Sequence, residues 1–325
     1  GLPEGLDAIR RYASQAKGIR SILDIFTGNG ASEPIEIALT ALLNPGDEVL
    51  TPSPGYPLYT AVLAKLGVRN VPYHLDEEAG WQPDVEEIRR LVGPRTRAVV
   101  VINPNNPTGS VASRETLAAI AEVCVERGLV LFSDEIYDRL LLDDGIEHVS
   151  PASLREDLMC LTFNGLSKVY FGPGLRMGWC ISSGPAEQMR PLIEAMQKLT
   201  RARLCASHPV QWGIAPALDG DHTFLHEAIA KLKRRRDITY ERLNAIAGIR
   251  CVKPTGAFYA FPSLEIEEDD ATWTRRVIAE TGVVIVHGSG FGQRPGTKHF
   301  RVVFLPDEQT LHRSFDQLEA FMRRR

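Results

Sequence analysis

A lysine in a glycine-rich setting is the first residue of this sequence that could carry out chemistry. Lys168 lies within the stretch TFNGLSKVYFGPGLRMGW at residues 162–179, directly after a serine and ahead of three glycines. Most lysines lie on the solvated surface, but the segment before this one, LMCLTF, is typical of a buried strand. Glycines also allow a backbone to approach a bound molecule closely. These surroundings favour a functional role for Lys168 over a surface role.

Polar segments follow several predicted strands, at the points where the strands end. In open α/β sheets, ligands bind beyond the carboxyl ends of the strands, so such segments are expected to meet at one site. The five segments are TGNGASE (residues 27–33), PSPGYP (52–57), NPNNPTG (103–109), SDEIYD (133–138) and NGLSK (164–168). Their shared polarity predicts a ligand-binding site at this edge of a sheet.

The first of these segments has the composition of a phosphate-binding helix start. GNGASE opens a predicted helix with small residues, so the backbone N–H groups of Ala31 and Ser32, with the Ser32 hydroxyl, could hold a phosphate. The same composition also suits an ordinary helix N-cap. The segment therefore supports a phosphate site only in combination with other residues.

Lys168 and Asp134 form a more specific combination. A lysine amine after one strand can form a Schiff base with an aldehyde, and a carboxylate after a neighbouring strand can pair with a heterocyclic nitrogen. This pairing is what a pyridoxal phosphate site requires. A surface lysine and a plain N-capping aspartate are the alternatives.

Alternating strand and helix patterns must position these residues. Amphipathic stretches predict helices at residues 33–43, 84–91 and 113–128, between short apolar runs that are typical of buried strands. This alternation predicts an α/β fold with a mainly parallel sheet covered on both faces, that is, a three-layer αβα large domain. The apolar runs are GDEVLTP, TRAVVVINP, GLVLFSDE, LMCLTFN and RMGWCISS.

The pattern changes after a long predicted helix at residues 223–246. Strand patterns at CVKPTGAFYAFP, GVVIVHG and HFRVVFL alternate with only two helical segments, which predicts a smaller α+β domain. We place the large domain at residues 1–235 and the small domain at residues 236–325, joined through the long helix.

Composition excludes several classes of protein. The 325 residues are 44% hydrophobic and 24% charged with a formal net charge of −4, typical of a soluble globular protein. The basic run at residues 231–236 lies in a helical pattern and is interpreted as a solvated helix face, not a nucleic-acid site. No membrane-spanning run, secretory signal or metal-ligand spacing is recognised. Five scattered cysteines favour reduced thiols and the cytoplasm.

The motifs NPNNPTG, SDEIYD and SK, with Arg176 eight residues after the lysine, resemble the fold-type I aminotransferases (class I/II) that use pyridoxal 5′-phosphate. The four motifs occur in the order of that family, and the similarity extends over essentially the whole chain. The segments GNGASE, TFNGLSK, RLCAS and CVKPTGAFYAFP are further similar to the branch of bacterial alanine (glutamate:pyruvate) aminotransferases.

The resemblance implies a role for each matching residue. Lys168 is implied to bind the cofactor covalently and to move the substrate proton, Asp134 to pair with the ring nitrogen, and Tyr137 to bind the phenolic oxygen; these three are the catalytic residues. Arg301 is implied to bind the substrate α-carboxylate together with Asn106, and Arg203 a distal carboxylate. The implied cofactor-binding residues are Ala31, Ser32, Tyr56, Asn106, Asp134, Tyr137, Ser167, Lys168 and Arg176.

Structural roles remain open for four of these residues. Tyr56 could be a core or turn tyrosine, Arg176 and Arg301 could form ordinary ion pairs, and Arg203 could bind backbone carbonyls or an acidic neighbour. The chain also departs from the family, because Gly165 stands where many relatives have a phosphate-binding serine. The chain has no initial methionine and begins within an apparent helix, so we expect an N-terminal arm to be missing.

The resemblance predicts transamination between an L-amino acid and a 2-oxo acid, with alanine and 2-oxoglutarate as the leading pair. It also predicts a homodimer without nucleic-acid or membrane partners. Two alternatives share the fold. One is a pyridoxal phosphate-dependent C–S β-lyase, and the other is the effector-binding domain of an aminotransferase-like transcription regulator.

Overall fold

The computed structural model describes residues 1–324. The helices are α1 (Pro3–Arg11), α2 (Ser32–Leu42), α3 (Pro57–Lys65), α4 (Val85–Leu91), α5 (Arg114–Arg127), α6 (Ala186–Ala202), α7 (His208–Gln211), α8 (Ile214–Asp219), α9 (Thr223–Asn244), α10 (Asp270–Thr281) and α11 (Glu308–Arg323). The strands are β1 (Ile22–Asn29), β2 (Glu48–Ser53), β3 (Arg69–Asp76), β4 (Gln82–Pro83), β5 (Thr96–Ile102), β6 (Val130–Asp134), β7 (Cys160–Gly165), β8 (Met177–Ser183), β9 (Ile249–Arg250), β10 (Tyr259–Ala260), β11 (Ser263–Leu264), β12 (Val286–His287) and β13 (Phe300–Val303).

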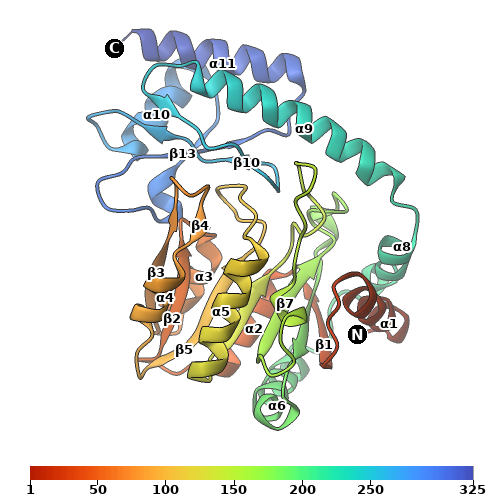
Figure 1. Ribbon diagram of the computed structural model, residues 1–325. Helices are drawn as coiled ribbons and strands as arrows, with labels where there is room; N and C mark the ends of the chain where they lie inside the picture. Colours follow the sequence, from red (N-terminus) through yellow and green to blue (C-terminus); the bar gives the residue numbers. More distant parts are fainter. Residues whose placement is uncertain (325) are drawn as a thin grey trace.

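An eight-stranded sheet forms the centre of the large domain (Figure 1). Its strand order is β1-β8-β7-β6-β5-β2-β3-β4. Strands β7, β6, β5, β2 and β3 run parallel, whereas β8 is antiparallel to both of its neighbours and β4 is antiparallel to β3. The predicted α/β class with a mainly parallel sheet is therefore confirmed.

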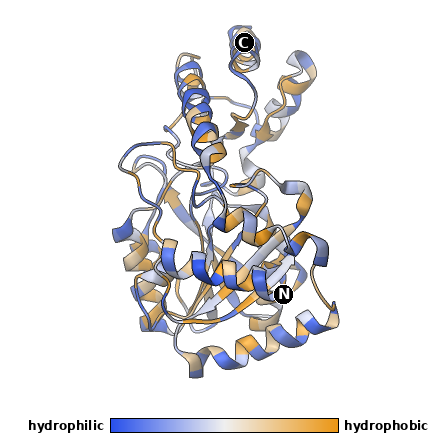
Figure 2. Ribbon diagram, turned by 90° about the vertical axis from the view of Figure 1, so that its right-hand side faces the viewer, coloured by the Kyte–Doolittle hydropathy of each residue, from blue (hydrophilic) through white to orange (hydrophobic). Residues whose placement is uncertain are grey.

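Side-chain alternation along the central strands builds two separate apolar layers. On β5, Val99 and Val101 belong to the apolar layer that includes residues of α1, α4, α5 and α8, whereas Val100 and Ile102 belong to the layer that includes residues of α2, α3 and α6. Successive strand residues point to opposite faces, so a strand that is apolar throughout must be covered on both sides. Figure 2 shows the result as hydrophobic strands between helices that carry both hydrophobic and hydrophilic residues.

Local signals define the helix ends. At α5, the Ser113 side chain accepts a hydrogen bond from the N–H of Thr116, and Gly128 ends the helix in the left-handed conformation with φ 64°. Helix α1 begins at Pro3, directly after the extended residue Leu2. The expectation that the chain opens in the middle of a helix is wrong, because proline fixes the first turn here.

The small domain packs its helices α10 and α11 and the far end of α9 around a second apolar core. Its three-stranded sheet has the order β10-β13-β12, and each strand spans only two to four residues. The strands are much shorter than the apolar runs in the sequence. Ile136, Tyr137 and Val169 of the large domain also belong to this second core, which joins the two domains beside the predicted site.

The basic run at residues 231–236 is not a uniformly solvated face. Arg236 is only 2% exposed, and its guanidinium donates to the carbonyl oxygens of Pro254 and Leu142 and to the carboxylate of Asp143. The interpretation as a solvated face is wrong for this residue, because these oxygens and the neighbouring Asp237 carboxylate, four partners in all, compensate its burial. These bonds therefore connect α9 to the loop after Leu142.

None of the helices within residues 1–324 is long and apolar enough to cross a membrane.

Candidate active site

A cavity of about 300 Å³ lies at the carboxyl ends of the parallel strands, below the small domain. It contains three cationic side chains, Lys168, Arg176 and Arg301, and one carboxylate, Asp134. This charge balance suits a ligand with several negative charges. The other lining residues are Ala31, Ser32, Ile35, Tyr56, Leu58, Ile102, Asn106, Ile136, Tyr137, Ser167, Pro173 and Tyr259. The cavity thus brings together every predicted site residue except Arg203.

Lys168 lies three residues beyond the end of β7, in a turn held by backbone hydrogen bonds. Leu166 N–H donates to the Met177 carbonyl, and Phe171 N–H donates to the carbonyl of Lys168 itself. The ammonium nitrogen lies 5.9 Å from the ring centre of Tyr137. Burial lowers the pKa of Lys168, and the charges of Arg301 and Arg176 lower it further. A larger share of this lysine is therefore neutral and nucleophilic than in an exposed lysine.

Asp134 is the last residue of β6 and lies at the bottom of the cavity, only 4% exposed. Burial raises its pKa to about 6, although the Ile136 N–H and the Tyr59 hydroxyl both donate hydrogen bonds to its carboxylate. The Tyr59 hydroxyl lies 3.2 Å from Oδ2. Sequence reasoning missed Tyr59, although its place three residues after Tyr56, at the start of α3, is a usable signal.

One end of the cavity has the features of an anion site. Helix α2 begins at Ser32, and no side chain caps its first N–H groups, which leaves them available to a ligand. The alternative of an ordinary side-chain N-cap is thus not observed. Arg176 approaches Gly30 so closely that a Cβ there would lie 2.4 Å from the guanidinium, and Gly30 has φ +72°. The left-handed backbone at position 30 and the close approach of Arg176 both favour glycine there.

Arg301 lines the cavity from strand β13 of the small domain. Its Nη1 donates to Oδ1 of Asn106 at 3.0 Å, and its guanidinium carbon lies 4.8 Å from the ring centre of Tyr259 and 4.6 Å from that of Phe291. Its buried Nε has no hydrogen-bond partner. Burial lowers the pKa of Arg301. A guanidinium held in this way can offer free N–H groups to a carboxylate.

Arg203 does not reach the cavity of its own chain. Its Nε lies 3.1 Å from Oε2 of Glu33, and its Nη2 donates to the carbonyl of Thr27. Tyr56, in contrast, lies at the mouth of the cavity and is 39% exposed.

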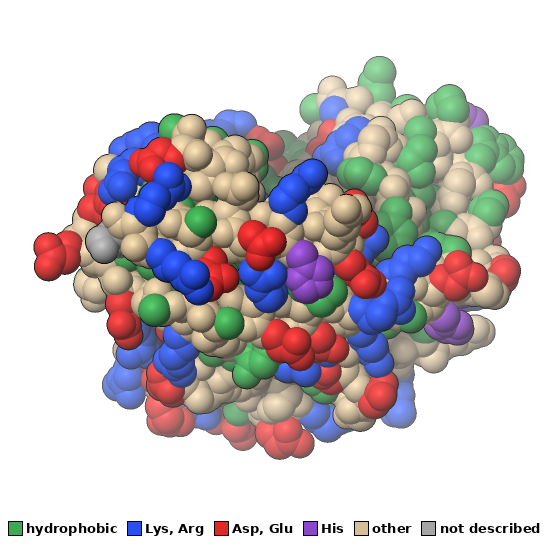
Figure 3. Space-filling view, turned by 90° about the horizontal axis from the view of Figure 1, so that it is seen from above, with side chains coloured by type: hydrophobic (Ala, Val, Ile, Leu, Met, Phe, Trp, Pro, Cys, Tyr) green, Lys and Arg blue, Asp and Glu red, His purple; other side chains and the backbone are tan. Residues whose placement is uncertain are grey.

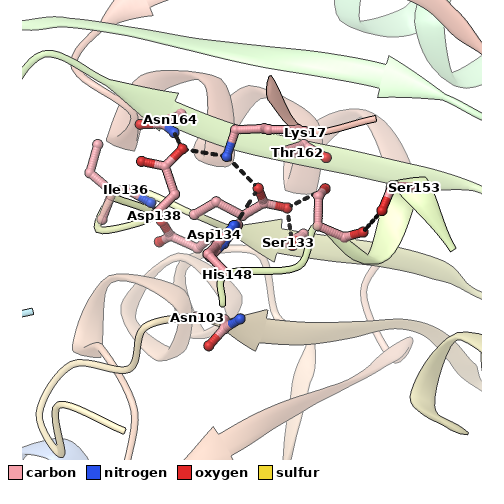
Figure 4. Close-up of polar contacts among 12 residues, drawn as sticks. Lys17, Asn103, Ser133, Asp134, Ile136, Asp138, His148, Ser153, Thr162 and Asn164 are labelled. Atoms are coloured by element: carbon pink, nitrogen blue, oxygen red, sulfur yellow. Dashed lines mark hydrogen bonds and ion pairs between the residues drawn. The ribbon is translucent and has the colours of Figure 1, made fainter. Parts of the chain in front are cut away.

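A buried polar cluster lies behind Asp134 and was not anticipated from the sequence (Figure 4). Lys17 forms ion pairs with Glu135 and Asp138, and all three side chains are at most 3% exposed. The Tyr12 hydroxyl and the Asn164 amide also donate to Asp138. Burial alone would raise the pKa of Asp138, but Lys17 and the hydrogen bonds lower it overall. The cluster attaches the N-terminal segment to the strand that carries Asp134.

The fold and the site define a member of the class I and II aminotransferases. The family model for aminotransferase class I and II matches residues 1–318, so the chain belongs to this family. Proteins of this family catalyse transamination with pyridoxal 5′-phosphate, and this enzyme is therefore a pyridoxal phosphate-dependent aminotransferase. The predicted enzyme class and cofactor are confirmed.

The chain is similar to several proteins that are named alanine or glutamate-pyruvate aminotransferases. The chain is 42% identical over 331 residues to the glutamate-pyruvate aminotransferase AlaA of Escherichia coli (strain K12). This alignment covers 99% of this chain and 81% of the E. coli protein. It is 42% identical over 306 residues to the alanine aminotransferase of Mycobacterium tuberculosis (strain H37Rv), covering 92% of this chain and 71% of the relative. The solved alanine aminotransferase from Pyrococcus furiosus is 41% identical with a TM-score of 0.96, covering 100% of this chain and 83% of that one.

The cavity fits the cofactor on the observations above. An uncapped helix start with Arg176 suits the phosphate, the deep carboxylate of Asp134 suits a ring nitrogen, and the nucleophilic Lys168 lines the same cavity. The orphaned Nε of Arg301 adds a donor for a substrate carboxylate.

Proposed function

We propose that this enzyme exchanges an amino group between alanine and 2-oxoglutarate, giving pyruvate and glutamate. The observation that carries the proposal is the cavity itself, in which Lys168, Asp134 and Arg301 converge in a chain 42% identical to glutamate-pyruvate and alanine aminotransferases. Arg301 and Asn106 would bind the α-carboxylate that all amino-acid substrates share.

Bound pyridoxal phosphate supplies an aldehyde and an electron-withdrawing ring. Lys168 would attach the cofactor, and its amine, when free, would then take and return the substrate's α-proton. The lowered pKa of Lys168 supports this role, because a general base must be neutral before it accepts a proton. Asp134 would hold a proton on the ring nitrogen.

The remaining residues would hold the cofactor in place. Ala31, Ser32, Ser167 and Arg176 would bind the phosphate at the start of α2. Tyr137 and Asn106 would bind the phenolic oxygen, and Tyr56 would stack on the ring from the cavity mouth.

We also propose that two chains assemble into a homodimer beside this site. Phe171 and Leu175 are 43% and 47% exposed and precede Arg176, while Leu204 is 86% exposed and follows Arg203. Large exposed apolar side chains that flank functional residues favour a protein interface. From above, hydrophobic side chains gather on the more distant, right-hand part of the molecule, whereas charged residues dominate the nearer surface (Figure 3).

In such a dimer, Arg203 would be placed to read the distal carboxylate of glutamate in the neighbouring subunit. Its contact with Glu33 would have to open for this, because the guanidinium points to its own chain here.

The free, mostly buried cysteines among the described residues support our proposal of a reducing compartment such as the cytoplasm.

A substrate panel tests the proposed function. Purified enzyme loaded with pyridoxal phosphate is assayed with alanine, glutamate, aspartate and phenylalanine, using pyruvate or 2-oxoglutarate as acceptor. We expect the alanine–2-oxoglutarate and glutamate–pyruvate pairs to react fastest. Faster turnover of aspartate or phenylalanine would contradict the substrate assignment. Pyruvate released from a cysteine conjugate without an acceptor would identify a lyase instead.

A further inference from the structure

Tyr259 lies in the cavity and touches two different parts of the proposed site. It is the first residue of β10, is 5% exposed, and pairs with Val303 of β13, the strand that carries Arg301. Tyr259 lies within the segment CVKPTGAFYAFP, but none of the roles assigned above belongs to it. Its hydroxyl and its ring make separate contacts, which suggest separate functions.

The hydroxyl of Tyr259 contacts the hydroxyl of Tyr137 at 2.9 Å. Burial raises the pKa of Tyr137 well above its ordinary value, so Tyr137 keeps its proton. Either hydroxyl can donate in this contact. When the Tyr137 O–H donates to an oxygen of a ligand in the cavity that both side chains line, the Tyr137 oxygen is left to accept from the Tyr259 O–H. Tyr259 thereby supports donation from Tyr137 to such a ligand.

The ring of Tyr259 supports Arg301. The guanidinium carbon lies 4.8 Å from its ring centre, within the range of a favourable cation–π contact. Arg301 has no ion-pair partner among the described residues, so the two aromatic rings and Asn106 hold it in place. If the Arg301 guanidinium moves toward a bound carboxylate, its contact with the Tyr259 ring therefore changes, and Tyr259 is also the side chain that contacts Tyr137.

We propose that Tyr259 is a positioning residue that couples carboxylate binding at Arg301 to the hydrogen bond that Tyr137 gives the cofactor. The inference rests on the proposed roles of Lys168, Tyr137 and Arg301. A simple core-packing role for Tyr259 would require only its ring volume, which phenylalanine retains.

The test uses the enzyme loaded with pyridoxal phosphate and follows its visible absorption band as a function of pH. The band reports protonation of the Lys168 nitrogen bound to the cofactor. Donation from Tyr137 stabilises the negative ring oxygen most when that nitrogen carries no proton. Tyr259→Phe weakens this donation. We therefore expect the pH at the midpoint of the absorption change to rise by about 0.5 to 1 unit.

Tyr73→Phe is the matched control. Tyr73 is 1% exposed and also loses one buried hydrogen bond, from its hydroxyl to the Val100 carbonyl at 2.8 Å, but it does not line the cavity. We expect its midpoint to stay within about 0.2 units of wild type. An unchanged midpoint in Tyr259→Phe, or an equal shift in Tyr73→Phe, overturns the proposal.

The ring is tested with Tyr259→Leu and with propanoate, an unreactive carboxylate, as the probe. Tyr259→Phe should keep KM for alanine within about twofold, whereas Tyr259→Leu should raise it about fivefold or more. Propanoate should shift the band midpoint of wild type, and this response should be at least halved in Tyr259→Leu. An undiminished response refutes the coupling. A wild-type protein without a visible band would instead refute the proposed function of Lys168.

Discussion

Asp134→Asn should stabilise the cofactor-free protein while it inactivates the enzyme. Burial raises the pKa of Asp134 from 3.8 to about 6, so the folded protein holds this proton more tightly than the unfolded chain. A raised acid pKa means that stability is lost as pH rises from the unfolded value to the folded value. At pH 7 to 8 the charged carboxylate therefore costs about 3 kcal/mol, since one pKa unit corresponds to about 1.4 kcal/mol.

Asparagine removes this charge and keeps the local hydrogen bonds. Its Oδ1 can still accept from the Ile136 N–H, and its amide can donate to the Tyr59 hydroxyl. The free energy of unfolding, measured by urea titration of cofactor-free protein at one concentration, should therefore be higher in the variant. We expect a gain of about 1 to 2 kcal/mol at pH 5 and about 3 kcal/mol at pH 8.

Asp138→Asn is a control with the opposite sign. Lys17 and the hydrogen bonds hold the pKa of Asp138 below its ordinary value despite burial, so its charge stabilises the fold above that value. Asp138→Asn should lose about 3 kcal/mol at neutral pH, with little change between pH 6 and 8. The reasoning is refuted if Asp134→Asn is less stable than wild type at pH 8, or if its gain does not grow with pH. In the enzyme loaded with pyridoxal phosphate, Asp134→Asn should lower kcat by at least about a hundredfold.

Three further substitutions test other parts of the site. Lys168→Ala should keep its far-UV circular dichroism but lose both the visible cofactor band and turnover, and retention of both would refute its assignment. Arg203→Ala should lower kcat/KM for glutamate about tenfold or more and leave alanine nearly unchanged; equal losses with a lower Tm would show that its pair with Glu33 is purely structural. Lys17→Met should lower the free energy of unfolding by about 3–5 kcal/mol, because two buried carboxylates lose their counter-ion; an unchanged urea midpoint would contradict this.

Local sequence signals predicted the elements whose ends bear the site. Continuous apolar runs located β5, β6 and β7, and the polar residues that follow them do converge on one cavity, because parallel strands end at the same edge. The capping serine Ser113 and the terminating Gly128 likewise act as their types predict. These features depend on neighbours in sequence, which a single chain displays directly.

The features that were missed depend on partners far away in the chain. Lys17 meets Glu135 across 118 positions, and Tyr137 meets Tyr259 across 122. The periodicity of the sequence does not predict such a contact, because each residue alone resembles an ordinary surface lysine or core tyrosine. The antiparallel direction of β8 is hidden for the same reason: an apolar run indicates a buried strand, not the direction in which the strand runs.

The distribution of the site along the chain has a consequence for the order in which the enzyme matures. The residues that line the anion end, the lysine and the deep carboxylate all lie between Ala31 and Arg176, on the large sheet or at its edge. Arg301 and Tyr259 come from the small domain and lie much later in the chain. During synthesis, the half that would bind the cofactor therefore leaves the ribosome well before the half that would recognise an amino acid. We expect a nascent chain to be able to capture its cofactor before it is able to select a substrate.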